Sequence, residues 1–155
     1  MGMTAEEAVY PVKRLASVPH RLELKLKPGG ITVIDDAFNS NIEGAKSAVE
    51  VLGSFKEGGR ILITPGIVEA GEKEFDLNYE FASHAGNFCD YIILVGKKQT
   101  EPMQKGLKDA EFNADNLYVA SDLNEAIGIM NNIATEGSTV LFENDLPDLY
   151  NEKLI

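Results

Sequence analysis

Short runs rich in apolar and β-branched residues alternate along this chain with longer runs of helical periodicity. Apolar and polar residues alternate over residues 20–27, which predicts a strand with one exposed face. Compact apolar runs predict the remaining strands, at residues 31–35, 60–64, 91–96, 117–120 and 138–144. Apolar spacings of three and four residues predict the intervening helices, at residues 42–55, 72–88, 99–110 and 121–135.

The order of these elements predicts the fold. Regular alternation of strand and helix, with continuous apolar strands, is typical of a parallel sheet covered on both faces. A tight turn at Pro28-Gly29-Gly30 separates the first two strands, so we expect the first strand to be antiparallel at an edge. We therefore predict an α/β fold, a three-layer Rossmann-like and mostly parallel sheet of about six strands with one antiparallel edge strand. Residues 1–18 fit this unit poorly. We predict them to be the tail of a preceding domain, with the α/β unit spanning 19–155.

Charge and composition exclude some classes of partner. The net charge of −11 argues against nucleic acid and against an anionic membrane surface as partners, because proteins bind both through clustered Lys and Arg. A nucleotide ligand stays possible, because a few local charges and backbone amides can bind phosphate. There is no apolar run of bilayer length and no signal peptide, so we expect a cytoplasmic protein without membrane insertion. The single cysteine, Cys89, has aromatic neighbours and is predicted to be a buried thiol.

Polar residues gather where the predicted parallel strands end, which is the edge where open α/β sheets bind ligands. The main group is Asp35-Asp36 followed by Asn39, Ser40 and Asn41. Carboxylates and amides there can bind ribose hydroxyls, an adenine edge or a hydrated Mg²⁺. Helix capping explains the residues from Asn39 to Asn41 without a ligand, and explains the aspartate pair less well. The chemistry of these residues leaves both interpretations open. The other strand ends carry Thr64-Pro65-Gly66, Gly96-Lys97-Lys98, Ser121-Asp122 and Glu143-Asn144-Asp145.

Several complete motifs are absent from the sequence. It contains no GxxxxGK[ST] phosphate loop, no GxGxxG turn, no His/Cys spacing for a metal and no GxSxG nucleophile elbow. We therefore predict no catalytic residue and no metal site within this chain. The His20-Arg21 pair carries little information alone. An arginine can hold a phosphate through two hydrogen bonds, but an isolated surface arginine is more often solvated.

The stretch from Pro19 to Leu52 resembles the start of the C-terminal domain of Mur ligases, cell-wall amide ligases that use ATP. The family's motif, close to DDSYNANP, corresponds to the run DDAFNSNI at residues 35–42. The similarity continues through RILITPGIVEAGE and DYIILVG and covers residues 14 to 142, closest to the members that add D-alanyl-D-alanine. A histidine of the family is replaced by Asn78.

This resemblance implies a function for a longer protein. Its substrates would be ATP, a UDP-muramoyl peptide and a D-amino-acid dipeptide, and a central domain would hold most of the ATP and Mg²⁺. The present domain would dock on the upstream domains of its own chain and close over ATP. The roles carried over by position are Arg21 on the ATP phosphates and Asp36 on the ribose. Asn39 and Asn41 would line the adenine side or fix the loop. The residues expected to face the incoming amine substrate are Ser40, Gly66 and Glu69.

Two other classes compete with the ligase interpretation. A signalling receiver domain also carries an acidic pair after its first parallel strand, but it needs an acceptor aspartate after the third strand and a lysine after the fifth. The corresponding runs here lead into Gly96 and Glu143. A non-catalytic nucleotide-binding or interaction module, with the Asp35-Asp36 pair in a purely structural role, is the second alternative.

Overall fold

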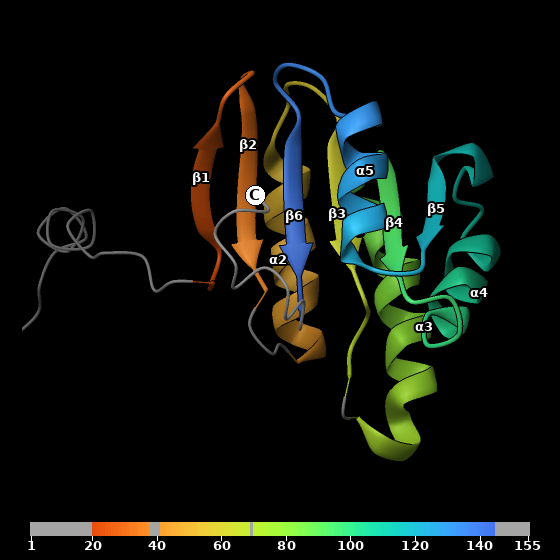
Figure 1. The fold of residues 1–155 in the computed structure, drawn as a ribbon. Helices are drawn as coiled ribbons and strands as arrows, with labels where there is room; N and C mark the ends of the chain where they lie inside the picture. The colour runs from red at the N-terminus through yellow and green to blue at the C-terminus, as the bar shows by residue number, and fades with distance from the viewer. Residues whose placement is uncertain (1–19, 38–40, 69, 145–155) are drawn as a thin grey trace, which may run out of the picture.

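The computed structural model describes residues 20–37, 41–68 and 70–144. Its centre is a six-stranded sheet with the strand order β1-β2-β6-β3-β4-β5 (Figure 1). The strands are β1 (Glu23–Lys27), β2 (Ile31–Asp36), β3 (Arg60–Thr64), β4 (Tyr91–Val95), β5 (Leu117–Ala120) and β6 (Thr139–Glu143). The helices are α2 (Ile42–Ser54), α3 (Glu74–Ala85), α4 (Glu101–Asp109) and α5 (Leu123–Ile133), with 3-10 turns η1 (Gly71–Lys73) and η2 (Ala114–Asn116).

The sheet topology confirms the fold predicted from the sequence. Strand β1 pairs antiparallel with β2 at one edge, and the other four pairings are parallel. The chain moves from β2 to β3, β4 and β5 through helices, and then returns to insert β6 between β2 and β3. The predicted helix at residues 72–88 is divided between the η1 turn and α3.

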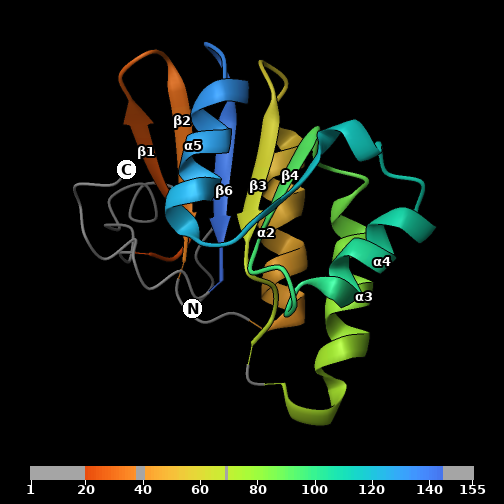
Figure 2. The same ribbon diagram turned by 45° about the vertical axis from the view of Figure 1, so that its right-hand side comes forward.

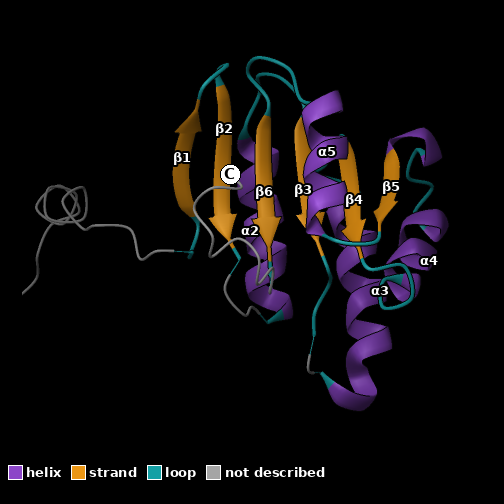
Figure 3. Ribbon diagram, in the orientation of Figure 1, coloured by secondary structure: helices purple, strands orange, loops and turns teal. Residues whose placement is uncertain are grey.

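Helices cover the two faces of the sheet unequally (Figures 2 and 3). Helices α2 and α3 lie on one face, and α5 alone covers the other among the described residues. Alternate residues of β3 divide the core accordingly. Leu62 packs toward α2 and α3, while Ile61 and Ile63 pack toward α5. All three are fully buried, and each stabilises the fold by about 1.5–3 kcal/mol relative to an exposed position.

Strand β1 has the reverse of the usual amphipathic orientation. Leu24 and Leu26 are 61% and 85% exposed, whereas the polar residues between them are half-buried. The leucines lie on the same side as Ile34 of β2, where the sheet extends beyond the cover of α2. Lys25 lies on the other side and pairs with Asp35. The exposed face predicted for this strand therefore carries its leucines.

Side-chain caps fix the starts of two helices. Asn41 Oδ1 accepts a hydrogen bond of 2.9 Å from Gly44 N at the start of α2. Asp122 Oδ1 accepts one of 2.9 Å from Glu125 N at the start of α5, and Glu125 reaches back to Ser121. Such caps typically stabilise a helix by about 1 kcal/mol. The Ser121-Asp122 group at the end of β5 is thus explained by capping.

Candidate functional site

The carboxyl ends of the parallel strands meet at one edge of the sheet, at the arrowheads in the lower part of Figure 1. Asn144, directly after β6, joins three of these ends. Its backbone N–H donates to the carbonyl of Asp36 after β2 at 3.1 Å, and its side-chain amide donates to the carbonyl of Gly66 after β3. The structure therefore brings together groups that the sequence places at three separate strand ends.

Asp35 is fully buried and faces strand β1. Its carboxylate accepts a hydrogen bond of 2.7 Å from Lys25 Nζ and one of 3.3 Å from Ala37 N, and it is hydrogen-bonded to His20 Nδ1 at 2.9 Å. Burial opposes ionisation of Asp35, but the bonds from Lys25 and Ala37 outweigh it, so its pKa lies below the usual value. Asp35 is an ion-pair anchor of the β1–β2 hairpin.

Asp36 points to the opposite face of the sheet and is half-buried. Its Oδ1 accepts a hydrogen bond of 3.0 Å from Leu22 N, while Oδ2 makes none with the described residues. Neither aspartate caps α2, since Asn41 does so. In register beside Asp36 lies Glu143 of β6, which is fully buried. One carboxylate oxygen of Asp36 thus remains for a ligand at this edge.

The turn before β1 has an unusual backbone conformation. His20 and Leu22 both have left-handed values of φ, 59° and 47°. The left-handed region costs a non-glycine residue about 1–2 kcal/mol, so other contacts must hold the turn. Two such contacts come from the aspartate pair, through His20 to Asp35 and through Leu22 N to Asp36. Arg21 lies between the two held residues and is exposed.

The sequence did not predict that the two aspartates hold the turn before β1, because they were interpreted only as ligand groups or helix caps. The signal available in the sequence was the alternation of β1, which places Lys25 on the same side of the hairpin as Asp35 once the turn is fixed. The structure therefore gives Asp35 and Asp36 a positioning role toward the turn that carries Arg21.

Hydrogen bonds from buried side chains fix the backbone of the loop after β3. Gly66 is buried with φ at +87°, and Thr64 Oγ1 accepts a hydrogen bond from its N–H at 3.0 Å. The side chain of Asn78 on α3 binds both the N–H and the carbonyl of Ile67, at 2.7 and 2.8 Å. A Cβ on Gly66 would overlap Asn78 Oδ1 and lie 2.8 Å from Met103 Sδ. Gly66 thus shapes this loop, and its predicted contact with an amine substrate stays a prediction.

A pocket of about 510 Å³ lies beyond the end of β4. Residues from the start of α3 and from the β4–α4 connection line it: Glu74, Phe75, Lys98, Gln99, Glu101 and Pro102. The ring of Phe75 is half-exposed, with Lys105 Nζ 5.9 Å from its centroid. Groups of both charges therefore surround an apolar surface near the ligand-binding edge.

Three of the predicted site residues, Asn39, Ser40 and Glu69, lie outside the described residues, and so does the segment 1–18 that we assign to a preceding domain. Within the described ranges, no group of three or more His, Cys, Asp or Glu side chains could hold a metal ion. No helix in this part of the chain is long and apolar enough to cross a membrane.

Comparison with known proteins identifies sequence relatives. The family model described as "Mur ligase, glutamate ligase domain" matches residues 20–143. UDP-N-acetylmuramoylalanine--D-glutamate ligase from Hydrogenovibrio crunogenus is 27% identical over 131 residues, which are 84% of this chain and 27% of that protein. The chain therefore spans about a quarter of the length of this curated relative.

Solved structures share the fold. The MurF ligase of Thermotoga maritima in complex with ADP superposes with a TM-score of 0.70 at 19% identity, over 90% of this chain and 32% of that one. A MurF structure from Acinetobacter baumannii gives a TM-score of 0.74 at 19% identity, over 98% of this chain and 32% of that one. At these identities the likeness establishes the architecture alone.

Proposed function

Because this chain belongs to the Mur ligase family, we propose that it is the domain that closes over ATP in an ATP-dependent amide ligase of cell-wall peptide synthesis. Residues 1–18 would be the end of a preceding domain, which would hold Mg²⁺ and most of the nucleotide, and the protein would act in the cytoplasm. ATP would supply the phosphoryl group that activates a substrate carboxylate. We assign no catalytic residue to the chain itself.

The observation that carries this proposal is the arrangement of Asp36 and Arg21 at the carboxyl edge of the sheet. Asp36 Oδ1 holds the turn that contains Arg21, which leaves Oδ2 to accept a hydrogen bond from a ribose hydroxyl. The guanidinium of Arg21 would hold phosphate oxygens through paired hydrogen bonds. Asn41 uses Oδ1 to cap α2, so a contact with adenine would come from its amide nitrogen. Asn39 would also lie on the adenine side of the nucleotide.

The incoming amine substrate would lie next to the nucleotide, toward the pocket beyond β4. Lys98 would meet a carboxylate, Glu74 or Glu101 an ammonium, and Phe75 an apolar side chain. A zwitterion with an apolar body fits a lining that carries groups of both charges beside an aromatic ring. We therefore propose D-alanyl-D-alanine as the amine and a UDP-muramoyl tripeptide as its acceptor. Ser40, Gly66 and Glu69 would complete this side of the site.

A titration of the isotope-labelled chain with Mg-ADP tests the nucleotide role. We expect amide chemical-shift changes at residues 20–22, 36 and 41, with weak affinity because the domain supplies one wall of the site. Asp36→Asn keeps an oxygen that can accept from Leu22 N but removes the charge. It should weaken binding by about tenfold or more, as expected for the loss of a charged hydrogen bond. Asp115→Asn, in the exposed η2 turn before β5, is the matched control and should leave affinity unchanged.

Two results would contradict the proposal. Micromolar affinity of the chain alone would mean that the site is complete without a second domain. Shift changes that avoid the edge, or equal affinity in Asp36→Asn and Asp115→Asn, would instead favour a non-catalytic interaction module in which the aspartate pair is purely structural. The family match already favours a ligase domain over a receiver domain.

A further inference from the structure

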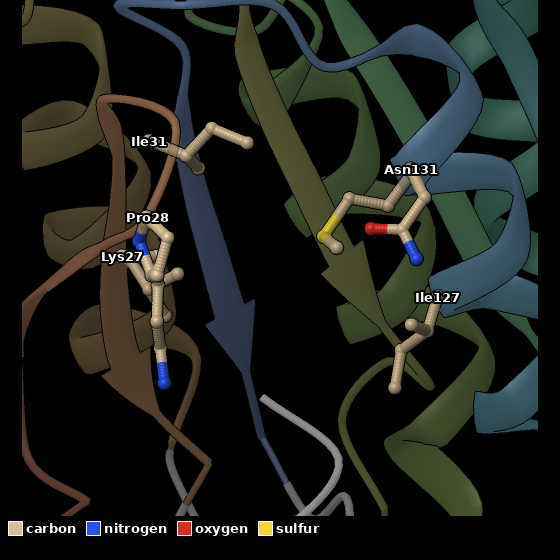
Figure 4. Close-up of a pocket in the computed structure, with 7 residues that line it drawn as sticks. Lys27, Pro28, Ile31, Ile127 and Asn131 are labelled. Atoms are coloured by element: carbon tan, nitrogen blue, oxygen red, sulfur yellow. The ribbon is translucent and has the colours of Figure 1, made fainter.

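A second hollow lies on the face covered by α5, away from the ligand-binding edge (Figure 4). It has a volume of about 310 Å³ and separates the β1–β2 hairpin from α5. Its lining is mainly apolar, and Lys27 and Asn131 contribute the long polar side chains: Lys27, Pro28, Ile31, Val33, Ile127, Met130 and Asn131. We refer to these seven residues as the α5-face groove.

The groove is distinct from the proposed nucleotide site. Ile31 begins β2, and Asp36 ends it. A strand rises about 3.3 Å per residue, so the two positions are separated by roughly 17 Å. Ile31 and Val33 also face α5, whereas Asp36 faces the opposite side of β2, so a nucleotide held by Asp36 would lie on the other face of the sheet. The apolar lining of the groove therefore needs another occupant.

We propose that residues 145–155 of this chain occupy the α5-face groove. This segment follows Asn144 at the end of β6, the strand that lies beside β2. Val33 in the groove pairs in register with Val140, four residues before Asn144, so the segment must return along roughly 13 Å of strand. Eleven residues span about 16 Å as a helix and about 36 Å when extended, so the segment reaches the groove in either form.

The chemistry of the segment matches the groove. Four of its apolar residues recur at positions i, i+3, i+4 and i+8, a spacing that gathers them on one side of a helix: Leu146, Leu149, Tyr150 and Leu154. Ile155 follows them at the end of the segment. It carries three acidic residues and one lysine: Asp145, Asp148, Glu152 and Lys153. An acidic, amphipathic segment suits an apolar groove that has Lys27 among its lining residues.

Thiol cross-linking in the full chain tests this inference. The pair Asn131→Cys and Tyr150→Cys places one thiol at the groove and one in the segment. The control pair combines Tyr150→Cys with Asn87→Cys, an exposed position two residues after the end of α3. Helix α3 lies on the face of the sheet opposite to α5. Native Cys89 is buried, and burial raises its pKa to about 12, so it does not compete for a bismaleimide. We expect intramolecular cross-linking at least about tenfold faster in the groove pair, because docking raises the effective concentration of the two thiols.

A second pair of variants tests the amphipathic docking itself. Leu149→Asp, added to the groove pair, should remove the rate advantage, whereas Asn151→Asp adds the same charge outside the apolar spacing and should preserve it. Equal rates in the groove and control pairs, or an advantage that survives Leu149→Asp, would overturn the inference. Cross-links formed between chains would also overturn it, in favour of a second copy as the occupant.

Discussion

Replacing Gly66 by alanine probes the loop on which the amine side of the proposed site depends. Two costs add at this position. The left-handed φ of +87° costs alanine about 1–2 kcal/mol, and displacement of Asn78 would leave buried groups of Ile67 unsatisfied at about 1–3 kcal/mol. The expected loss is therefore about 2–5 kcal/mol, a large fraction of the stability of an ordinary domain.

Gly29 provides a matched control for the backbone cost. It has the same φ of +87°, but a Cβ there would meet no atom within 4 Å. Gly29→Ala should lose only about 1–2 kcal/mol in urea-induced unfolding, so the difference between the two variants isolates the contact with Asn78. If both variants lose the same stability, the loop can shift to accept a methyl group, and Asn78 does not hold it rigidly.

Two further predictions concern titratable groups. Cys89 should not react with a thiol reagent at pH 8 in the folded protein, because burial raises its pKa to about 12, and it should react at once in denaturant. Because the folded pKa of Asp35 lies below the value of 3.8 for a free side chain, its stabilisation is complete above pH 3.8 and is lost as the pH falls further. Asp35→Asn should therefore lower the melting temperature near pH 6, and this deficit should shrink toward pH 2. A deficit independent of pH would contradict the ion pair with Lys25.

The sequence was sufficient to predict the fold because the fold depends on periodicity. The strands at Arg60–Thr64 and Leu117–Ala120 were predicted to the residue, since each is a compact β-rich run bounded by turn or capping residues. The antiparallel edge strand followed from the short Pro28-Gly29-Gly30 turn, which is too short for a crossover. What periodicity could not predict was the orientation of β1, because the exposure of its leucines depends on how far α2 extends across the sheet.

The sequence could predict which residues lie at the candidate site, but not the hydrogen bonds that they make there. Strand ends meet at one edge in any parallel sheet, so Asp36, Gly66 and Asn144 could be expected to lie near one another. Their hydrogen bonds depend on left-handed loop residues, and glycine or asparagine at such a position does not show which group it will bind. Asn144 has φ at 64°, and its side-chain amide donates to the carbonyl of Gly66. Leu22 has φ at 47°, and its backbone N–H donates to Asp36.

The two oxygens of Asp36 link the fold of the domain to its proposed function. Oδ1 is already committed to Leu22 N, and that bond helps to hold Arg21 in a turn that costs free energy to form. A ribose hydroxyl on Oδ2 would bind the same carboxylate, so nucleotide binding would stabilise the turn, and a formed turn would favour binding by the same factor. A nucleotide should therefore protect the Leu22 amide from hydrogen exchange, although that amide does not face the ligand in this proposal. Asp35 cannot substitute for this function, since its carboxylate is enclosed by Lys25 and His20.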